Sequence, residues 1–216
     1  MNSKFFLFIL LSASFVQAQN WKAVEGKIMS QWAKKVNPEN VWQEYPRPQF
    51  ERAQWKNLNG LWDYAILKTN QIQHKRFQGK ILVPFSFESS LSGVGKKIHP
   101  EDKMWYKRNF MLSENWKEKD VILHFEAVDY KCAVWVNDIL VGTHKGGFDR
   151  FSFNITPYLK SKGQQKIVLA VEDATNFSSQ PRGKQQINSS GIYYTPVSGI
   201  WQTVWLEAVS SEAYLT

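Results

Sequence analysis

The chain has 216 residues, of which 43% are hydrophobic and 15% aromatic, enough for the core of one sandwich-sized domain. Its formal net charge is +8, but the lysines are scattered among acids without a dense basic block, which argues against nucleic-acid binding. The single cysteine, Cys132, excludes an intramolecular disulfide. Its place on the apolar face of a predicted strand indicates a buried, inert thiol.

Residues 1–18 predict a secretory signal peptide. Lys4 precedes an apolar run over residues 5–11, and residues 16–18 (Val-Gln-Ala) match a small-residue cleavage site. The run is shorter than the about 20 residues of a membrane span, so we expect no membrane span. The sequence therefore predicts a secreted or periplasmic protein; a buried N-terminal strand is the alternative.

Residues 19–51 form a predicted lead-in segment before the domain proper, which we place at residues 52–209. Val24, Ile28 and Trp32 have the spacing of one helical face and predict a short amphipathic helix. Two prolines further on favour irregular structure.

The first part of the domain predicts strands separated by polar loops. Strands are expected over residues 61–67, 81–83 and 104–112, where apolar and polar side chains alternate. Residues 88–102 are rich in Ser, Gly and Lys and predict a long exposed loop.

Residues 121–155 contain the clearest period-two alternation in the chain. Asn137-Asp138 is a two-residue turn signal, because both residues tolerate the positive φ of tight hairpins. Further strands are predicted over residues 166–173 and 201–206, with a polar loop over residues 174–190, and residues 210–216 read as the start of a following domain or linker. Short turns, with no helical pattern between the strands, predict an all-β, jelly-roll β-sandwich.

Two segments carry a resemblance to a known family: LHFEAVDYKCAVWVNDILVGTHKGGFDRFSFNIT (residues 123–156) and GIYYTPVSGIWQTVWLE (residues 191–207). NLNGLWDYAI, ILVPFSFES and MWYKRNF add weaker matches in the same order. The chain resembles the N-terminal sugar-binding domain of glycoside hydrolase family two, which includes β-galactosidases, β-glucuronidases and β-mannosidases. The resemblance implies a galactose-binding-domain-like jelly roll and a carbohydrate partner.

The richest candidate sugar-binding loop is predicted over residues 180–196. Aromatic faces can stack on sugar rings, and fixed amide and guanidinium groups can bind hydroxyls, so loops on a rigid sandwich can supply both. The candidate side chains are Arg182, Gln185, Asn188, Tyr193 and Tyr194. The alternative is that the tyrosines and Trp201 are core or interdomain packing residues.

The resemblance also bears on two individual positions. In β-galactosidase-like relatives an acidic residue shortly before the SGI motif reaches the active site, and Tyr193 occupies that position here. This departure leaves open the choice among galactoside, glucuronide and mannoside. A second contact loop would lie around residues 99–101, which makes Glu101 a further sugar-binding candidate.

Glu126 and Asp129 are the nearest approach to the two carboxylates that a retaining glycosidase needs. Their positions at the end of a strand and in its turn predict a role in turns and solvated faces instead. The resemblance places both catalytic glutamates in a downstream barrel domain, so no catalytic residue is assigned here. The four histidines lack metal-ligand spacing, and no cofactor motif is present in the sequence.

Three functions remain open on the sequence alone. The leading hypothesis is the N-terminal, sugar-binding part of a secreted family-two glycosidase, inactive by itself, whose partners are carbohydrate and the downstream domains of the parent enzyme. The second is a freestanding carbohydrate-binding module without hydrolase activity. The third is a structural or adhesion domain, which exposed tryptophans would favour.

Overall fold

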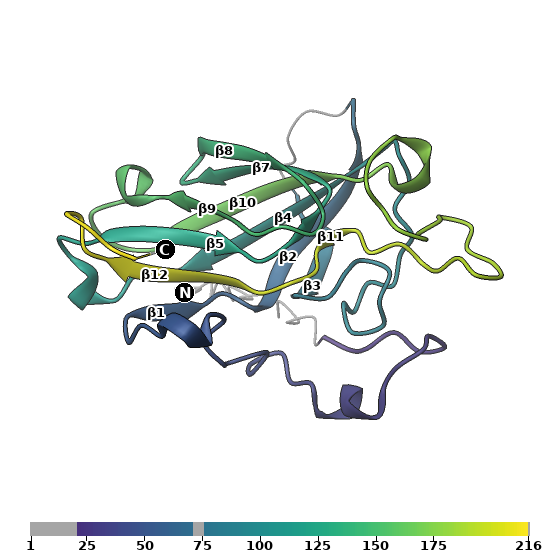
Figure 1. Cartoon of the computed structure of the whole chain (residues 1–216), viewed down its shortest axis with the longest axis horizontal. Helices are drawn as coiled ribbons and strands as arrows, with labels where there is room; N and C mark the ends of the chain where they lie inside the picture. The colour runs from purple at the N-terminus through teal and green to yellow at the C-terminus, as the bar shows by residue number, and fades with distance from the viewer. Residues whose placement is uncertain (1–20, 71–75, 216) are drawn as a thin grey trace, which may run out of the picture.

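The alternating segments of the sequence form two antiparallel sheets packed face to face, in a computed structural model that describes residues 21–70 and 76–215. The four-stranded sheet has the order β1-β12-β5-β9, and the six-stranded sheet the order β3-β2-β4-β10-β7-β8 (Figure 1). A two-stranded pair, β11-β6, lies at one end. The predicted all-β sandwich is confirmed, whereas the predicted signal peptide, residues 1–18, lies outside the described residues.

The strands of the four-stranded sheet are β1 (Trp55–Asn57), β5 (Asp120–Phe125), β9 (Phe151–Asn154) and β12 (Val204–Val209). Those of the six-stranded sheet are β2 (Gly60–Lys68), β3 (Gly79–Val83), β4 (Asp102–Phe110), β7 (Lys131–Val136), β8 (Ile139–Lys145) and β10 (Gln165–Glu172). The small pair is β6 (Val128–Asp129) with β11 (Gly199–Ile200). Five short 3₁₀ helices complete the described elements: η1 (Gln31–Lys35), η2 (Pro48–Phe50), η3 (Glu114–Trp116), η4 (Thr156–Tyr158) and η5 (Thr175–Phe177). None of these helices approaches the length and apolarity needed to cross a bilayer.

The core lies between the two sheets and follows the predicted alternation. In β7, Cys132, Val134 and Val136 are buried against the opposite sheet, while Lys131 is exposed. The free thiol of Cys132 is buried, as expected, and burial raises its pKa to about 12. The turn at Asn137 and Asp138 has positive φ at both residues, which is the hairpin geometry that the sequence predicts.

Two local predictions are wrong. The lead-in forms no amphipathic helix: its only helical elements are the short 3₁₀ helices η1 and η2, and Ile28 is fully exposed. The segment over residues 88–102 is not an exposed loop, because Glu88, Ser92 and Ile98 are buried. Its serine hydroxyls and backbone satisfy one another; Ser92 Oγ, for example, donates to the carbonyl oxygen of Ser89 at 2.8 Å. Internal polar contacts therefore allow a segment with a loop-like sequence to be buried.

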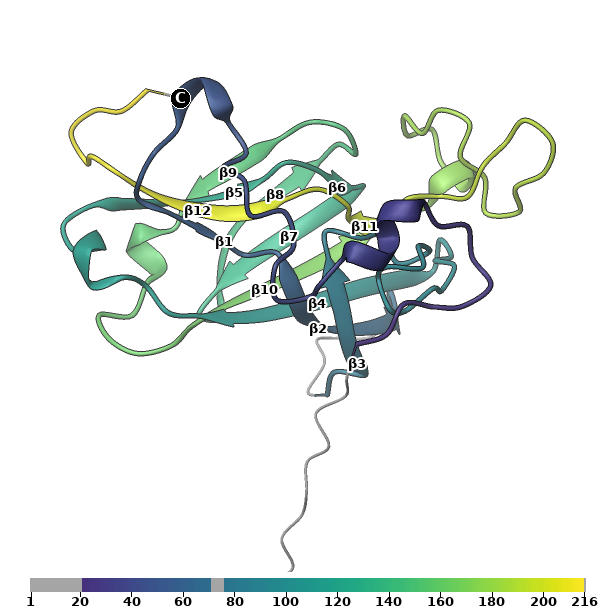
Figure 2. The same cartoon turned by 90° about the horizontal axis from the view of Figure 1, so that it is seen from below.

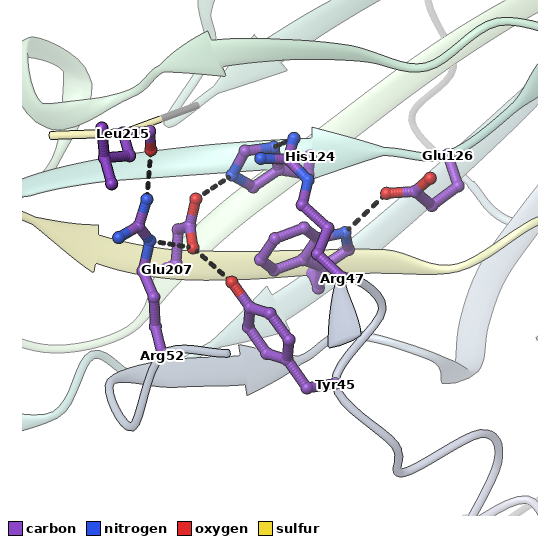
Figure 3. A network of polar contacts seen from close by, with 8 residues as sticks. Tyr45, Arg47, Arg52, His124, Glu126, Glu207 and Leu215 are labelled. Carbon is purple, nitrogen blue, oxygen red and sulfur yellow. Dashed lines mark hydrogen bonds and ion pairs between the residues drawn. The ribbon is translucent and has the colours of Figure 1, made fainter. Parts of the chain in front are cut away.

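The lead-in is fastened to the outer face of the four-stranded sheet through Glu207 of β12 (Figure 3). Tyr45 Oη donates to Glu207 Oε2 at 2.9 Å, and Arg52 Nε donates to the same oxygen at 2.8 Å. The other oxygen, Oε1, lies 3.0 Å from His124 Nε2. Burial alone would raise the pKa of Glu207, but the hydrogen bonds from His124 and Tyr45 keep it below its usual value. An ionised carboxylate therefore joins the lead-in to β5 and β12.

One glycine allows the backbone of β11 to approach a core tyrosine closely. Gly199 has φ of +87°, and a Cβ built on it would lie 1.9 Å from Tyr106 Oη. The same hydroxyl accepts a hydrogen bond from the Ile200 backbone N–H at 3.0 Å. The backbone of β11 can approach Tyr106 this closely only because residue 199 has no side chain.

We expect Gly199→Ala to lower the free energy of unfolding by about 2–5 kcal/mol, because it combines left-handed strain with overpacking. Gly191→Ala is the matched control: its φ is +59°, but no atom lies within 4 Å of the added Cβ. The control should lose only the conformational part, about 1–2 kcal/mol. Urea unfolding measures both variants, and equal losses would contradict the claimed contact with Tyr106.

Candidate functional site

The segment between β10 and β11, residues 174–198, projects from one end of the sandwich, opposite the C-terminal end of β12 (Figures 1 and 2). It folds back on itself: the Tyr194 N–H donates to the Lys184 carbonyl at 3.2 Å, and the Gln186 N–H donates to the Tyr194 carbonyl at 3.1 Å. This segment carries five of the six predicted sugar-binding residues: Arg182, Gln185, Asn188, Tyr193 and Tyr194.

These five residues divide into exposed and buried groups, and Asn188 is one of the exposed ones. Tyr193 and Tyr194 are 42% and 55% exposed, so neither is a core residue of this domain. Arg182 is half-buried, and its Nε has no hydrogen-bond partner among the described residues. Gln185 is 5% exposed, and its Oε1 accepts the Val197 N–H at 2.6 Å. Gln185 therefore holds the loop in place, while the tyrosines and Arg182 remain open to a ligand.

Glu101 lies apart from this loop. It immediately precedes β4 and is exposed, and its Oε1 lies 3.1 Å from Lys68 Nζ. Lys68 also pairs with Asp102 at 2.7 Å, which ties the ends of β2 and β4 together. The structure thus gives Glu101 an ion pair at a strand end and places the other five candidates on one loop without it.

Three buried carboxyl groups meet at the base of the loop, and sequence reasoning missed them. Ser198 links two of them: its N–H donates to Glu88 Oε2 at 3.0 Å, and its hydroxyl donates to Asp173 Oδ2 at 2.6 Å. Asp129 is the third member; its carboxyl group accepts a hydrogen bond from the Gln185 side chain and interacts with the charge of Asp173. The expectation that Asp129 serves a solvated turn is wrong, because it is 2% exposed in β6. Polar residues at strand ends resemble turn residues, so no sequence pattern indicated this burial.

Burial raises the pKa of two members of this cluster, Glu88 and Asp129. It raises the pKa of Glu88 to about 7, against the hydrogen bonds from Ser198. It also raises the pKa of Asp129 to about 7, with a further contribution from the charge of Asp173. One oxygen of each group, Glu88 Oε1 and Asp129 Oδ1, has no partner among the described residues. Both carboxyls therefore bind protons near neutral pH.

A glycosidase also uses a carboxyl group with a raised pKa as its general acid. Accessibility to substrate decides whether these carboxyl groups could act as such an acid or only anchor the loop. Glu88, Asp129 and Asp173 are 2–3% exposed. A Cβ on Gly147 would lie 2.7 Å from the carboxyl group of Asp129, so backbone packs directly against it. A glycosidic bond cannot reach these groups, and their geometry suits anchoring of the loop.

Glu126 is half-buried and accepts the Trp205 indole N–H at 3.3 Å.

The structure offers no preformed metal centre in the part of the chain that it describes: no three His, Cys, Asp or Glu side chains there are arranged to hold an ion. The loop over residues 174–198 can present the aromatic faces of Tyr193 and Tyr194 and the guanidinium group of Arg182 on a rigid support. That combination suits recognition of a polar ring with an apolar face.

Comparison with known proteins identifies the protein family to which the chain belongs. Residues 55–208 match the sequence profile of the family "Glycosyl hydrolases family 2, sugar binding domain", and the chain belongs to this family as an N-terminal domain. A β-galactosidase from Thermoanaerobacter pseudethanolicus is 32% identical over 106 residues, which cover 49% of this chain and 14% of that protein. A putative β-glucuronidase from Formosa agariphila is 26% identical over 174 residues, covering 79% of this chain and 20% of that protein.

Solved structures agree on the fold. A calcium-binding mutant of Bacteroides uniformis β-glucuronidase 2 superposes with a TM-score of 0.54 at 25% identity, covering 73% of this chain and 18% of that chain. The β-glucuronidase of Ruminococcus gnavus superposes with a TM-score of 0.58 at 21% identity, covering 77% of this chain and 30% of that chain. The chain therefore spans less than a third of the length of these proteins.

The cluster predicts a specific pH dependence. Because the folded-state pKa of Asp129 is raised, its contribution to stability is fully present below the unfolded-state pKa and is lost as pH rises through about 7. Asp129→Asn should remove this loss, so the variant gains stability relative to the parent between pH 5 and pH 8. Over this range the gain is at most on the order of 3 kcal/mol, because the loss stops once pH exceeds about 7.

Urea unfolding at a series of pH values measures this difference, and subtracting the parent curve cancels the contributions of other groups. Asp138→Asn, which removes an exposed carboxylate in the β7-β8 turn, is the control. A constant difference between Asp129→Asn and the parent across this pH range would show that Asp129 is ionised throughout.

Proposed function

We propose that this domain is the sugar-binding part of an exported enzyme that hydrolyses terminal β-glycosides in carbohydrate metabolism. The family match over residues 55–208 and the names of its relatives, β-galactosidases and β-glucuronidases, support the substrate class. The signal-like sequence of residues 1–18 supports export. In this proposal, the two catalytic carboxylates belong to other domains of the parent enzyme.

The observation that carries the proposed role is the loop over residues 180–196. Tyr193 and Tyr194 are exposed on a segment whose base is held by buried Gln185 and Ser198. Exposed aromatic rings on a rigid support provide stacking surfaces for the apolar faces of sugars, with little conformational entropy to lose on binding. The domain would shape the rim of an active site and bind the sugar there.

We expect the purified chain to show no hydrolysis of p-nitrophenyl β-galactoside, β-glucuronide or β-mannoside. Glu88, Asp129 and Asp173 at the base of the loop are buried, so none of these three carboxyl groups can act as a nucleophile toward these substrates. Release of p-nitrophenol measures turnover. Turnover that persists in Glu126→Gln and Asp129→Asn variants would contradict the proposal that catalysis needs another domain.

We expect the chain to bind one of the three corresponding sugars weakly, and Tyr194→Ala and Arg182→Ala to reduce that binding. Loss of one stacked ring should cost about 0.5–1.5 kcal/mol, or two- to tenfold in affinity. Tyr214→Ala is the matched control, because Tyr214 is similarly exposed but lies beyond β12. Isothermal titration calorimetry measures each variant, and equal affinities in all of them would exclude the loop as the sugar site.

One observation favours a second function, that of a structural or adhesion domain. Trp32 and Trp42 of the lead-in are 63% and 52% exposed, and both line an apolar hollow with Phe85 and Leu91. Large exposed aromatics mark contact surfaces. Absence of sugar binding, together with self-association that Trp42→Ala abolishes, would favour this second function.

A further inference from the structure

The outer face of the six-stranded sheet carries a hollow that faces away from the core. Trp105 of β4, Ala170 of β10, Ala133 of β7 and Thr143 of β8 are directly opposite one another in the strand registers. The two alanines in the middle of this row are too small to fill the surface between the neighbouring side chains. They form the floor of a hollow of about 530 Å³, a volume within the range of small-ligand sites.

Aromatic rings bound this hollow. The Trp105 and Trp135 rings are stacked, with centroids 5.7 Å apart and planes at 27°. Trp105 is buried beneath its neighbours, whereas Trp135 is half-buried and borders the hollow. A ring of a ligand that lay over the alanines would meet an apolar surface backed by two indoles.

A charged row runs along one side of the same hollow. Lys103, Glu172, Lys131 and Lys145 are directly opposite one another on β4, β10, β7 and β8. Lys103 pairs with Glu172 at 2.7 Å. Lys131 lies opposite Lys145, and among the described residues neither forms an ion pair with an acid. Like charges directly opposite on neighbouring strands repel, and a bound anion would remove the repulsion.

The hollow continues toward the candidate loop. A second hollow of about 290 Å³ shares Lys131 and Glu172 with the first and is lined further by Tyr130, Lys145 and Gln180. Lys145 Nζ lies over the Tyr130 ring at 5.9 Å, so an aromatic face and a cation lie together here as well. The two hollows together form a groove from the sheet face to the base of the loop over residues 174–198. We call it the lysine groove.

We propose that the lysine groove binds an acidic oligosaccharide, with a sugar ring over Ala133 and Ala170 beside Trp135 and an anionic substituent at Lys131 and Lys145. The anionic substituent is a carboxylate or a sulfate ester, because either one pairs with two lysines. The choice of a sugar as ligand rests on the proposed function above. The anionic character and the position rest on the groove itself, which is distinct from Tyr193, Tyr194 and Arg182.

The test titrates the purified chain with three β-linked tetrasaccharides: a mannuronate oligomer, sulfated cellotetraose and neutral cellotetraose. Calorimetry gives affinities, and amide and indole NMR shifts locate the binding surface. We expect at least one acidic ligand to bind more tightly than the neutral one and to shift the Trp135 indole signal. Comparing the affinity for the mannuronate oligomer with that for sulfated cellotetraose shows whether the carboxylate or the sulfate ester is preferred.

Two variants test the groove independently. Ala133→Leu fills the floor without changing charge and should weaken acidic binding at least about tenfold, by the steric cost of overpacking. Lys131→Gln should weaken acidic binding about two- to fivefold, the range of one exposed ion pair, and leave neutral binding unchanged. Lys162→Gln, which removes an exposed lysine beyond the other end of β10, is the charge-matched control and should bind as the parent does.

Absence of binding by all three ligands, equal affinity for acidic and neutral ligands, or unchanged affinity in Ala133→Leu would each overturn the proposal. Shifts confined to residues 180–196 would also overturn it while supporting the loop as a sugar site. Conversely, groove binding that survives Tyr194→Ala would support the lysine groove even if the loop fails its own test. The two proposals are therefore separable by one set of spectra.

Discussion

The contact between the Gly199 backbone and the Tyr106 ring is the constraint on which the functional end of this domain depends. Tyr106 belongs to a central strand and is fully buried, so its hydroxyl has a fixed position in the core. Ile200 donates its N–H to that hydroxyl, and Gly199 supplies the space. Because the loop carrying Tyr193 and Tyr194 ends at this point, the core fixes where the loop rejoins the sandwich, in addition to the hydrogen bonds within the loop itself.

The buried acids extend this constraint from one point to the whole base of the loop. Ser198, next to Gly199, bonds both Glu88 and Asp173, and Asp129 accepts a bond from Gln185. Three ionised carboxylates in one buried site would repel strongly, and a raised pKa is the way such a site reduces its charge. The loop is thus held in part by Glu88 and Asp129, two groups whose proton occupancy changes near neutral pH.

The fold was predictable where one face of a strand is buried and the other is not. The alternation in β7 and the positive-φ turn at Asn137 and Asp138 are local properties, so the sequence carries them directly. The burial of Glu88 and Ser92 was not predictable, because it depends on partners that the fold brings from far along the chain, such as Ser198.

The candidate site shows the same division. Exposed tyrosines in a polar loop could be recognised from composition and from resemblance. The sequence could not separate Gln185, which is buried and positions the loop, from Arg182, which remains partly open. Both are polar residues in one segment, and only the path of the folded chain distinguishes them.

At this end of the sandwich, two aspartates are buried while neighbouring lysines lie at the surface. This difference in burial affects the surface charge at this end. Asp129 is only two residues before Lys131, and Asp173 directly follows Glu172, yet the aspartates are buried while Lys131 is exposed. Because burial raises the pKa of Asp129 to about 7, Asp129 carries only part of a negative charge near neutral pH and offsets the charge of Lys131 only partly. The surface at this end is therefore more basic near neutral pH than a count of its ionisable residues suggests. This excess of positive charge lies along the path from the sheet face to the loop, where an acidic sugar chain would gain most from it.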